Sequence, residues 1–258
     1  MQFRARLPIA LPGDGTLGFN PRVATADSIP ALLDRGLWFP DPREARETHG
    51  LGGMVAIGGD LQPERLLLAY RSGIFPWTVD PVTWWSPDPR AVFELDRMHV
   101  PRSLARVMRR GAFEVTENRA FRGVMEGCAR ARRSGNWISR DFIEAYTRLH
   151  ELGHAHSVEC WQDGKLAGGI YGVAVGGLFA GESMFHRVSD ASKVALVSLA
   201  ARLRERGFTL FDIQMMTDTT ARFGAVEISR DAYLDRLAAA VRVPCEFATG
   251  GSPRAGTA

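Results

Sequence analysis

Three polar side chains interrupt apolar segments of the chain, and their types and spacing are suited to chemistry. Glu182 follows Gly181 at the end of a strongly apolar segment, where burying a carboxylate without a partner is costly. Asp212 and Gln214 lie two residues apart in the apolar run 210–215, so an extended strand places both side chains on one face. This pattern indicates a catalytic site. A buried polar network that only satisfies its own hydrogen bonds fits the spacing equally well.

A second pattern is typical of zinc peptidases. His150, Glu151 and His154 match the H-E-x-x-H motif, in which two histidines one helical turn apart bind zinc and the glutamate acts as a base. We expect the helix to end at Gly153, which takes His154 off the face that carries His150. A catalytic zinc also needs a third protein ligand, and the next histidine and glutamate lack the required spacing. The motif therefore predicts a polar helix end without metal, and zinc peptidase stays an alternative function.

Acyl transfer from coenzyme A is a further alternative. Its pyrophosphate loop begins with Gln or Arg and continues with spaced glycines, whose backbone N–H groups bind phosphate. Only Arg132 and Arg204 begin an R-x-x-G string, and the sixth positions hold Trp137 and Thr209. Neither string can form the loop, so we expect no coenzyme A and no other cofactor.

Composition limits the class of protein. With 258 residues, 45% of them hydrophobic, the chain can bury a substantial core in one or two domains. Cys128, Cys160 and Cys245 form neither a disulfide framework nor a metal knuckle, which favours a reducing compartment. The N-terminus lacks an apolar signal region, and the apolar stretch 166–181 is too short and glycine-rich to cross a membrane. We expect a cytoplasmic protein without a membrane partner.

Positive charge is concentrated in one segment. The net charge is only +3, but residues 97–140 hold eleven arginines and three glutamates, so the rest of the chain is mildly acidic. A polyanion partner fits this segment, as does an ordinary solvated helix face. The best candidates for phosphate contacts recur at helical spacing on one face and are Arg102, Arg106, Arg109 and Arg110.

Hydrophobic periods predict the elements that position these residues. Helices are expected at about 60–73, 101–110, 118–132, 139–152, 190–206 and 231–241. Alternation around turns at 163–164 and 176–177 predicts a three-stranded antiparallel meander, and 210–215 predicts a buried strand. The proline-rich block 74–90 cannot form a long helix. This order predicts an α+β fold with a small mixed N-terminal domain (1–95), an acyltransferase-like domain (96–245) and a flexible tail (246–258).

Longer strings of the sequence resemble the leucyl/phenylalanyl-tRNA-protein transferase family. They include Gly181-Glu182-Ser183-Met184-Phe185 and Asp212-Ile213-Gln214. The other matching segments are 56–61, 67–77, 84–92, 137–138, 144–146, 149–157 and 190–193. Because these segments run in one order through most of the chain, the resemblance is specific. It also accounts for the run from His150 to His156 without a metal.

The resemblance implies an enzyme, an aminoacyltransferase. The family moves Leu, Phe or, less readily, Met from aminoacyl-tRNA to the N-terminal Arg or Lys of acceptor proteins, which marks them for degradation. It further implies an acetyltransferase-like (GNAT-like) C-terminal domain that does not use coenzyme A. We expect a monomer. A protein that binds the tRNA acceptor end without catalysis is a third hypothesis.

The resemblance also implies roles for individual residues. The reaction is aminolysis of an ester, in which a neutral amine attacks the carbonyl and a ribose oxygen leaves. Asp212 and Gln214 would orient or deprotonate the amine, and Glu182 would bind the positive N-terminal residue. Trp77 and Trp137 would stack the terminal adenosine. The pocket for the donor side chain would be lined by Tyr146, Phe179, Met184 and Leu196.

The strand that carries Gln214 leads into a turn that departs from the family pattern. Thr219 stands where a histidine is usual, and Arg222 stands where a small polar residue is common. The departure affects the acceptor preference more than the type of reaction.

Overall fold

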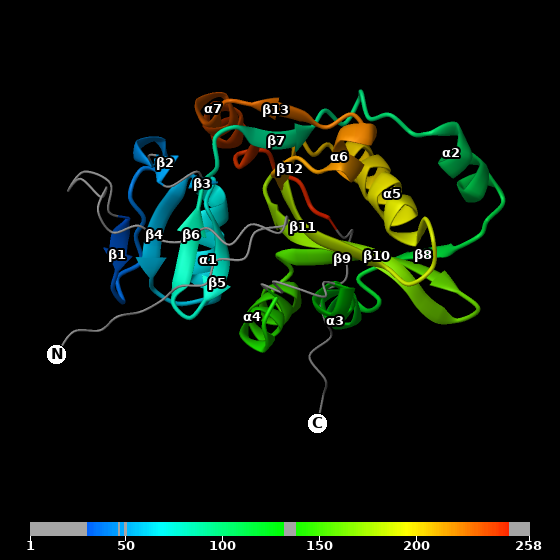
Figure 1. The fold of residues 1–258 in the computed structure, drawn as a ribbon, viewed down its shortest axis with the longest axis horizontal. Helices are drawn as coiled ribbons and strands as arrows, with labels where there is room; N and C mark the ends of the chain where they lie inside the picture. The colour runs from blue at the N-terminus through cyan, green and yellow to red at the C-terminus, as the bar shows by residue number, and fades with distance from the viewer. Residues whose placement is uncertain (1–29, 46, 49–50, 132–137, 248–258) are drawn as a thin grey trace.

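The structure is a computed structural model that describes residues 30–45, 47–48, 51–131 and 138–247 (Figure 1). Two main sheets, each accompanied by helices, form the molecule, so the α+β class predicted from the sequence is confirmed. Most of the range 246–258, which we predicted as a tail, lies outside the described residues. Within the described ranges, no helix is both long and apolar enough to cross a membrane.

A small sheet forms the N-terminal part of the molecule. Its strands lie in the order β1-β4-β6-β5, with bounds Ala31–Leu33, Met54–Gly58, Val82–Trp85 and Phe75–Val79. Short elements before β4 are η2 (Pro42–Glu44), β2 (Glu47–Thr48) and β3 (Leu51–Gly52). Helix α1 (Pro63–Arg71) leads to Gly73, whose φ of 75° suits a residue without a side chain. The proline-rich block supplies strands and no helix, as predicted.

The large sheet carries the candidate site. Its strands among the described residues lie in the order β13-β7-β12-β11-β10-β9-β8. Their bounds are Val226–Ile228, Arg90–Phe93, Leu210–Gln214, Leu178–His186, Lys165–Val175, Ala155–Gln162 and Glu114–Glu117. Strands β9, β10 and β11 form the predicted antiparallel meander, and β12 adds to β11 in parallel. Strand β7 pairs within this sheet although it precedes residue 95, where we predicted the domain boundary.

Helices cover both faces of the large sheet (Figure 1). On one face lie α3 (Phe121–Ala131) and α4 (Arg140–Glu151), and on the other lie α5 (Ala191–Glu205) and α2 (Arg102–Arg109). The remaining helices are α6 (Asp218–Arg222) and α7 (Arg230–Ala240). The six predicted helices are all present. The one expected at 118–132 begins later, at Phe121, because the chain leaves β8 through a left-handed residue, Asn118, with a φ of 56°.

Two apolar cores hold the molecule together. The first joins the small sheet and α1 to α3, α4 and α7, and it includes Tyr146. The second lies between the large sheet and α5, and it includes Phe179 and Leu196. Phe247 is buried in the second core, where its ring stacks on His156. The described chain therefore ends in a packed residue.

Candidate active site

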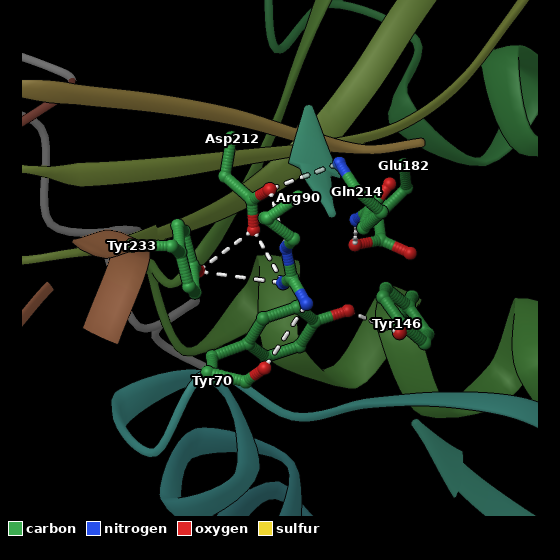
Figure 2. Close-up of polar contacts among 8 residues, drawn as sticks. Tyr70, Arg90, Tyr146, Glu182, Asp212, Gln214 and Tyr233 are labelled. Carbon is green, nitrogen blue, oxygen red and sulfur yellow. Dashed lines mark hydrogen bonds and ion pairs between the residues drawn. The ribbon is translucent and has the colours of Figure 1, made fainter. Parts of the chain in front are cut away.

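The candidate site lies where two neighbouring strands of the large sheet diverge. Strands β11 and β12 pair as far as Ala180 and Asp212, and the described pairing ends there. A bulge in β11 leaves Glu182 without a residue opposite it on β10. Beyond this point the strands are joined by side chains, because Gln214 Nε2 donates a hydrogen bond of 2.8 Å to Glu182 Oε1 (Figure 2).

Asp212 is buried, and each of its carboxylate oxygens accepts two hydrogen bonds. Oδ1 accepts from Arg90 Nε and from the backbone N–H of Gln214, both at 2.9 Å. Oδ2 accepts from Arg90 Nη2 at 2.7 Å and from the Tyr233 hydroxyl at 2.9 Å. The ion pair with Arg90 is bidentate, and both side chains are only 1% exposed. The charge of Asp212 is therefore compensated within the protein.

Arg90 begins β7 and connects three parts of the molecule. Its Nη1 donates to the carbonyl oxygen of Gly73, beyond the end of α1, at 3.1 Å. The guanidinium also lies over the rings of Phe75 and Tyr233, 5.0 and 4.3 Å from their centroids. Burial alone lowers the pKa of Arg90, but the Asp212 carboxylate raises it above its ordinary value. Arg90 is thus a permanent buried cation.

Gln214 has a left-handed backbone with a φ of 59°, which is uncommon for a residue that carries a side chain. The register of β12 against β7 also shifts between Asp212 and Gln214. The N–H bond from Gln214 to Asp212 accompanies this conformation, and the side-chain amide points toward Glu182 (Figure 2). Backbone conformations of this kind are concentrated at functional sites.

Glu182 differs from Asp212 because its hydrogen-bond donors are neutral. Gln214 donates to its carboxyl group, and so does the hydroxyl of Tyr70. Burial raises the pKa of Glu182 to about 8, against the opposing effect of the Tyr70 hydrogen bond. Tyr70 and Tyr146 share a hydrogen bond, and burial raises the pKa of both phenols. A carboxyl group in this state can gain its charge when a cation arrives.

Two family models match the chain. One is described as leucyl/phenylalanyl-tRNA protein transferase and matches residues 92–238, and the other is described as the N-terminal domain of the same transferase and matches residues 59–88. The chain belongs to the leucyl/phenylalanyl-tRNA protein transferase family. The larger match contains Glu182, Asp212 and Gln214, whereas Arg90 falls between the two matches.

Curated relatives with the name leucyl/phenylalanyl-tRNA–protein transferase are similar over most of their length. One from Citrobacter koseri is 52% identical over 209 residues, which cover 80% of this chain and 88% of the relative. One from Nitratidesulfovibrio vulgaris is 54% identical over 218 residues, which cover 83% and 92%. The family resemblance seen in the sequence is confirmed, and the chain is an aminoacyltransferase enzyme.

Some solved structures are also similar to this transferase. A ribosomal-protein-alanine N-acetyltransferase from Brucella melitensis is 21% identical with a TM-score of 0.30, covering 38% of this chain and 76% of its own. The C-terminal domain of a putative lysylphosphatidylglycerol synthetase from Agrobacterium fabrum is 16% identical with a TM-score of 0.36, covering 64% and 56%.

The structure brings together some of the residues predicted for the transferase site and separates others. Glu182, Asp212 and Gln214 meet at the diverging strands, with Tyr146 close by through Tyr70 (Figure 2). The four residues predicted for the aminoacyl pocket do not share one core. Tyr146 belongs to the first core, whereas the second core contains Phe179 and Leu196, with Met184 packed against it. Their roles stay predictions.

The aromatic residues predicted to hold the adenosine are described only in part. Trp77 lies on β5, half-buried, and packs edge-to-face on Trp85 with ring centroids 5.4 Å apart. Trp137 lies outside the described residues. Trp84 and Trp85, on the neighbouring strand β6, are buried. The half-buried ring of Trp77 leaves part of its surface for a ligand.

The arginines predicted to contact tRNA lie along one helix, from its first residue to its C-cap. Arg102, Arg106 and Arg109 belong to α2, Arg110 caps it, and all four are exposed. Helix α2 lies on the α5 side of the large sheet, opposite α4 (Figure 1). The basic surface and the Tyr70–Tyr146 pair are therefore on different sides of that sheet.

The two histidines of the H-E-x-x-H pattern do not lie on one helix. Helix α4 ends at Glu151, and His154 follows Gly153, whose φ is 81°. His150 stacks on the Phe121 ring, and its Nδ1 lies 2.8 Å from a backbone carbonyl oxygen. In the described part of the chain, histidine, cysteine and carboxylate side chains form no group of three or more that could hold a metal ion. The pattern is a packed helix end.

Arg90, Tyr70 and Tyr233 were not predicted from the sequence as site residues. Arg90 is the first residue of β7 and precedes its apolar residues. A charged residue on a buried strand is the same pattern that identified Asp212. Tyr70 and Tyr233 lie on the buried faces of α1 and α7, where a tyrosine also fits ordinary packing. A search for charged residues on every apolar strand would have found Arg90.

Proposed function

We propose that this enzyme transfers Leu, Phe or Met from aminoacyl-tRNA to the N-terminal Arg or Lys of acceptor proteins, as a monomer in the cytoplasm, and so feeds their degradation. The observation that carries the proposal is the pair formed by Glu182 and Gln214 between the diverging strands. A carboxyl group with a raised pKa meets an oriented amide there. The names of the curated relatives support the classes of donor and acceptor.

The chemistry requires two proton movements and little covalent catalysis. The α-ammonium group of the acceptor loses one proton before its nitrogen attacks the ester carbonyl. A second proton passes from that nitrogen to the ribose oxygen, which leaves as a hydroxyl group. Because an aminoacyl ester is already activated, holding the amine against the carbonyl supplies much of the acceleration.

The carboxyl and amide groups then have separate roles. Glu182 binds the positive N-terminal residue of the acceptor, and the arriving cation favours its ionised form, so that acceptor binding releases a proton. The Gln214 amide lies beside the reacting carbonyl and amine. Asp212 orients Gln214 through the backbone N–H bond.

The donor occupies the neighbouring surfaces in this proposal. Trp77 and Trp137 stack the terminal adenosine through their ring faces. The apolar side chain of the donor packs against Tyr146 on the side of the first core, and the other residues predicted for this pocket, Phe179, Met184 and Leu196, lie in or against the second core. The arginines of α2 bind the phosphates of the acceptor stem without base specificity, so tRNA affinity falls with salt.

The test incubates the purified protein with leucyl-tRNA and two peptides that differ only in an N-terminal Arg or Glu. The expected result is leucine attached to the Arg peptide alone. An acetylated Arg peptide is the control for attack by the α-amine. If leucyl-tRNA is bound with its ester intact and no peptide is labelled, the protein is a tRNA-binding protein and the proposal is wrong. Cleavage of the peptides that a chelator abolishes would favour the zinc peptidase alternative.

A further inference from the structure

The buried ion pair between Arg90 and Asp212 has more contacts than charge neutralisation requires. Arg90 uses three nitrogen atoms, which reach Asp212, Tyr233 and the Gly73 carbonyl oxygen. One of the four hydrogen bonds that the Asp212 carboxylate accepts comes from the backbone N–H of Gln214. The pair therefore connects the chain beyond α1 and helix α7 to the backbone of a predicted catalytic residue.

The contact with Gln214 lies at the point where β12 leaves regular strand geometry. An extended backbone at Gln214 would keep the normal pairing with β7, but its φ is 59° and the register shifts there. The Asp212 Oδ1 bond to the Gln214 N–H, at 2.9 Å, stabilises this left-handed conformation. The same conformation sends the side-chain amide to Glu182. Moving Asp212 would move that amide.

We propose that Arg90 is a positioning residue for aminoacyl transfer, which holds Asp212 so that Asp212 fixes the left-handed backbone of Gln214 and the place of its amide. The proposal rests on the proposed transfer function. Neither Arg90 nor Asp212 touches substrate, because every acceptor site of the carboxylate is used within the protein. Asp212 is therefore not the base that takes a proton from the amine.

Tyr233 is the second member of this positioning unit. Its hydroxyl donates to Asp212 Oδ2 and lies 3.3 Å from Arg90 Nη2, and its ring lies under the guanidinium. Helix α7, which carries Tyr233, packs so closely on Gly73 that an added Cβ would lie 2.6 Å from Leu234 Cδ2. These contacts fix the direction of the guanidinium, so a flexible ammonium group cannot replace it.

A purely structural ion pair is the competing explanation, and a paired substitution separates the two. Replacing both charges at once, in Arg90→Met with Asp212→Asn, removes the buried ions together and limits the loss of stability. If the ion pair only stabilises the fold, a double variant that folds has the kcat of the wild-type protein. If the ion pair positions Gln214, the kcat of the double variant is low even though the protein is folded.

The experiment measures kcat, the KM values for leucyl-tRNA and for an Arg peptide, and urea unfolding. We expect kcat of the double variant to fall about 100-fold, as for a reacting group displaced by about 1 Å, with the KM for leucyl-tRNA unchanged. The matched control replaces the half-exposed pair of Arg236 and Glu94, also bidentate, by Met and Gln. That control should keep the kcat of the wild-type protein.

Arg90→Lys provides a second route if the double variant does not fold. It keeps the charge beside Asp212 but loses the fork geometry and the contact with Gly73, so kcat should fall about 10-fold or more in folded protein. The wild-type kcat in either folded variant overturns the proposal. A wild-type protein without any transfer activity would instead refute the proposed function itself.

Discussion

Asp212 and Glu182 are two carboxylates of one site with opposite surroundings. Asp212 accepts four hydrogen bonds, two of them from the Arg90 cation. Glu182 accepts from the neutral groups of Gln214 and Tyr70, and burial raises its pKa to about 8. The difference shows which group can respond to a substrate. The charge of Asp212 is compensated in the folded protein, whereas in the proposed function Glu182 gains a charge when a cationic acceptor arrives.

Asp212→Ala gives the largest effect on stability. It leaves Arg90 buried without its counter-charge, which costs about 3–5 kcal/mol in the free energy of unfolding. Urea unfolding at pH 7 measures the loss. Glu182→Gln is the comparison variant, and we expect it to lose less than ~1 kcal/mol because a neutral amide replaces a carboxyl group that is largely protonated at this pH. Equal losses in the two variants would contradict the comparison.

The pH dependence of stability tests the state of Glu182. Its pKa is raised from 4.5 in the unfolded chain to about 8 in the folded protein, so between these values the folded state holds more protons. The stability that Glu182 contributes is therefore fully present at low pH and is lost as pH rises toward 8. We expect the unfolding free energy of the wild-type protein, relative to Glu182→Gln, to fall by at least ~1 kcal/mol between pH 5 and 8. A constant difference would show that Glu182 titrates normally.

Gly73→Ala tests the packing of helix α7 on Gly73, whose carbonyl oxygen accepts a hydrogen bond from Arg90. The substitution forces a side chain onto a φ of 75° and brings its Cβ to 2.6 Å from Leu234 Cδ2. We expect a loss of about 1–3 kcal/mol in thermal or urea unfolding. Gly207→Ala is the matched control, because Gly207 has the same φ with no atom within 4 Å of an added Cβ. The difference between the two losses of unfolding free energy measures the close packing of α7 on Gly73. Equal losses in the two variants would contradict a contribution of that packing to stability.

Tyr70→Phe gives the smallest effect. It removes a hydrogen bond that lowers the pKa of Glu182, so that pKa should rise further above its ordinary value. The unfolding free energy should fall by about 0.5–1.5 kcal/mol. Carboxyl NMR of Glu182 across pH measures the shift. Tyr146→Phe removes the other phenol and leaves the bond between Tyr70 and Glu182, so a larger shift in this variant would contradict the assigned cause.

The sequence was sufficient for elements with a strong hydrophobic period. The meander, the helices around 101–152 and the strand with Asp212 all appear close to their predicted bounds, because their apolar faces are buried as the period requires. Strands β8 and β13 were not predicted. They are short edge strands with exposed residues, and their pairing depends on neighbours far away in sequence.

Residues of the candidate site were predicted from the sequence, but the contacts that join them to the rest of the protein were not. Glu182 and Gln214 were recognised because polar groups on apolar strands are costly, and their hydrogen bond follows from the divergence of β11 and β12. Arg90 is 122 residues from Asp212, and no local pattern links a residue in β7 to one in β12. The left-handed backbone of Gln214 was also not predicted, because the prediction assumed that side chains alternate regularly along the whole strand.

The most direct test is steady-state transfer of leucine from leucyl-tRNA to an Arg peptide by wild-type protein and by Glu182→Gln. We predict that the KM for the peptide rises at least ~10-fold in the variant, because an amide cannot supply the negative charge that holds the acceptor. The affinity for leucyl-tRNA should not change. An unchanged peptide KM in folded Glu182→Gln would contradict the claim that Glu182 is the carboxylate that meets the substrate.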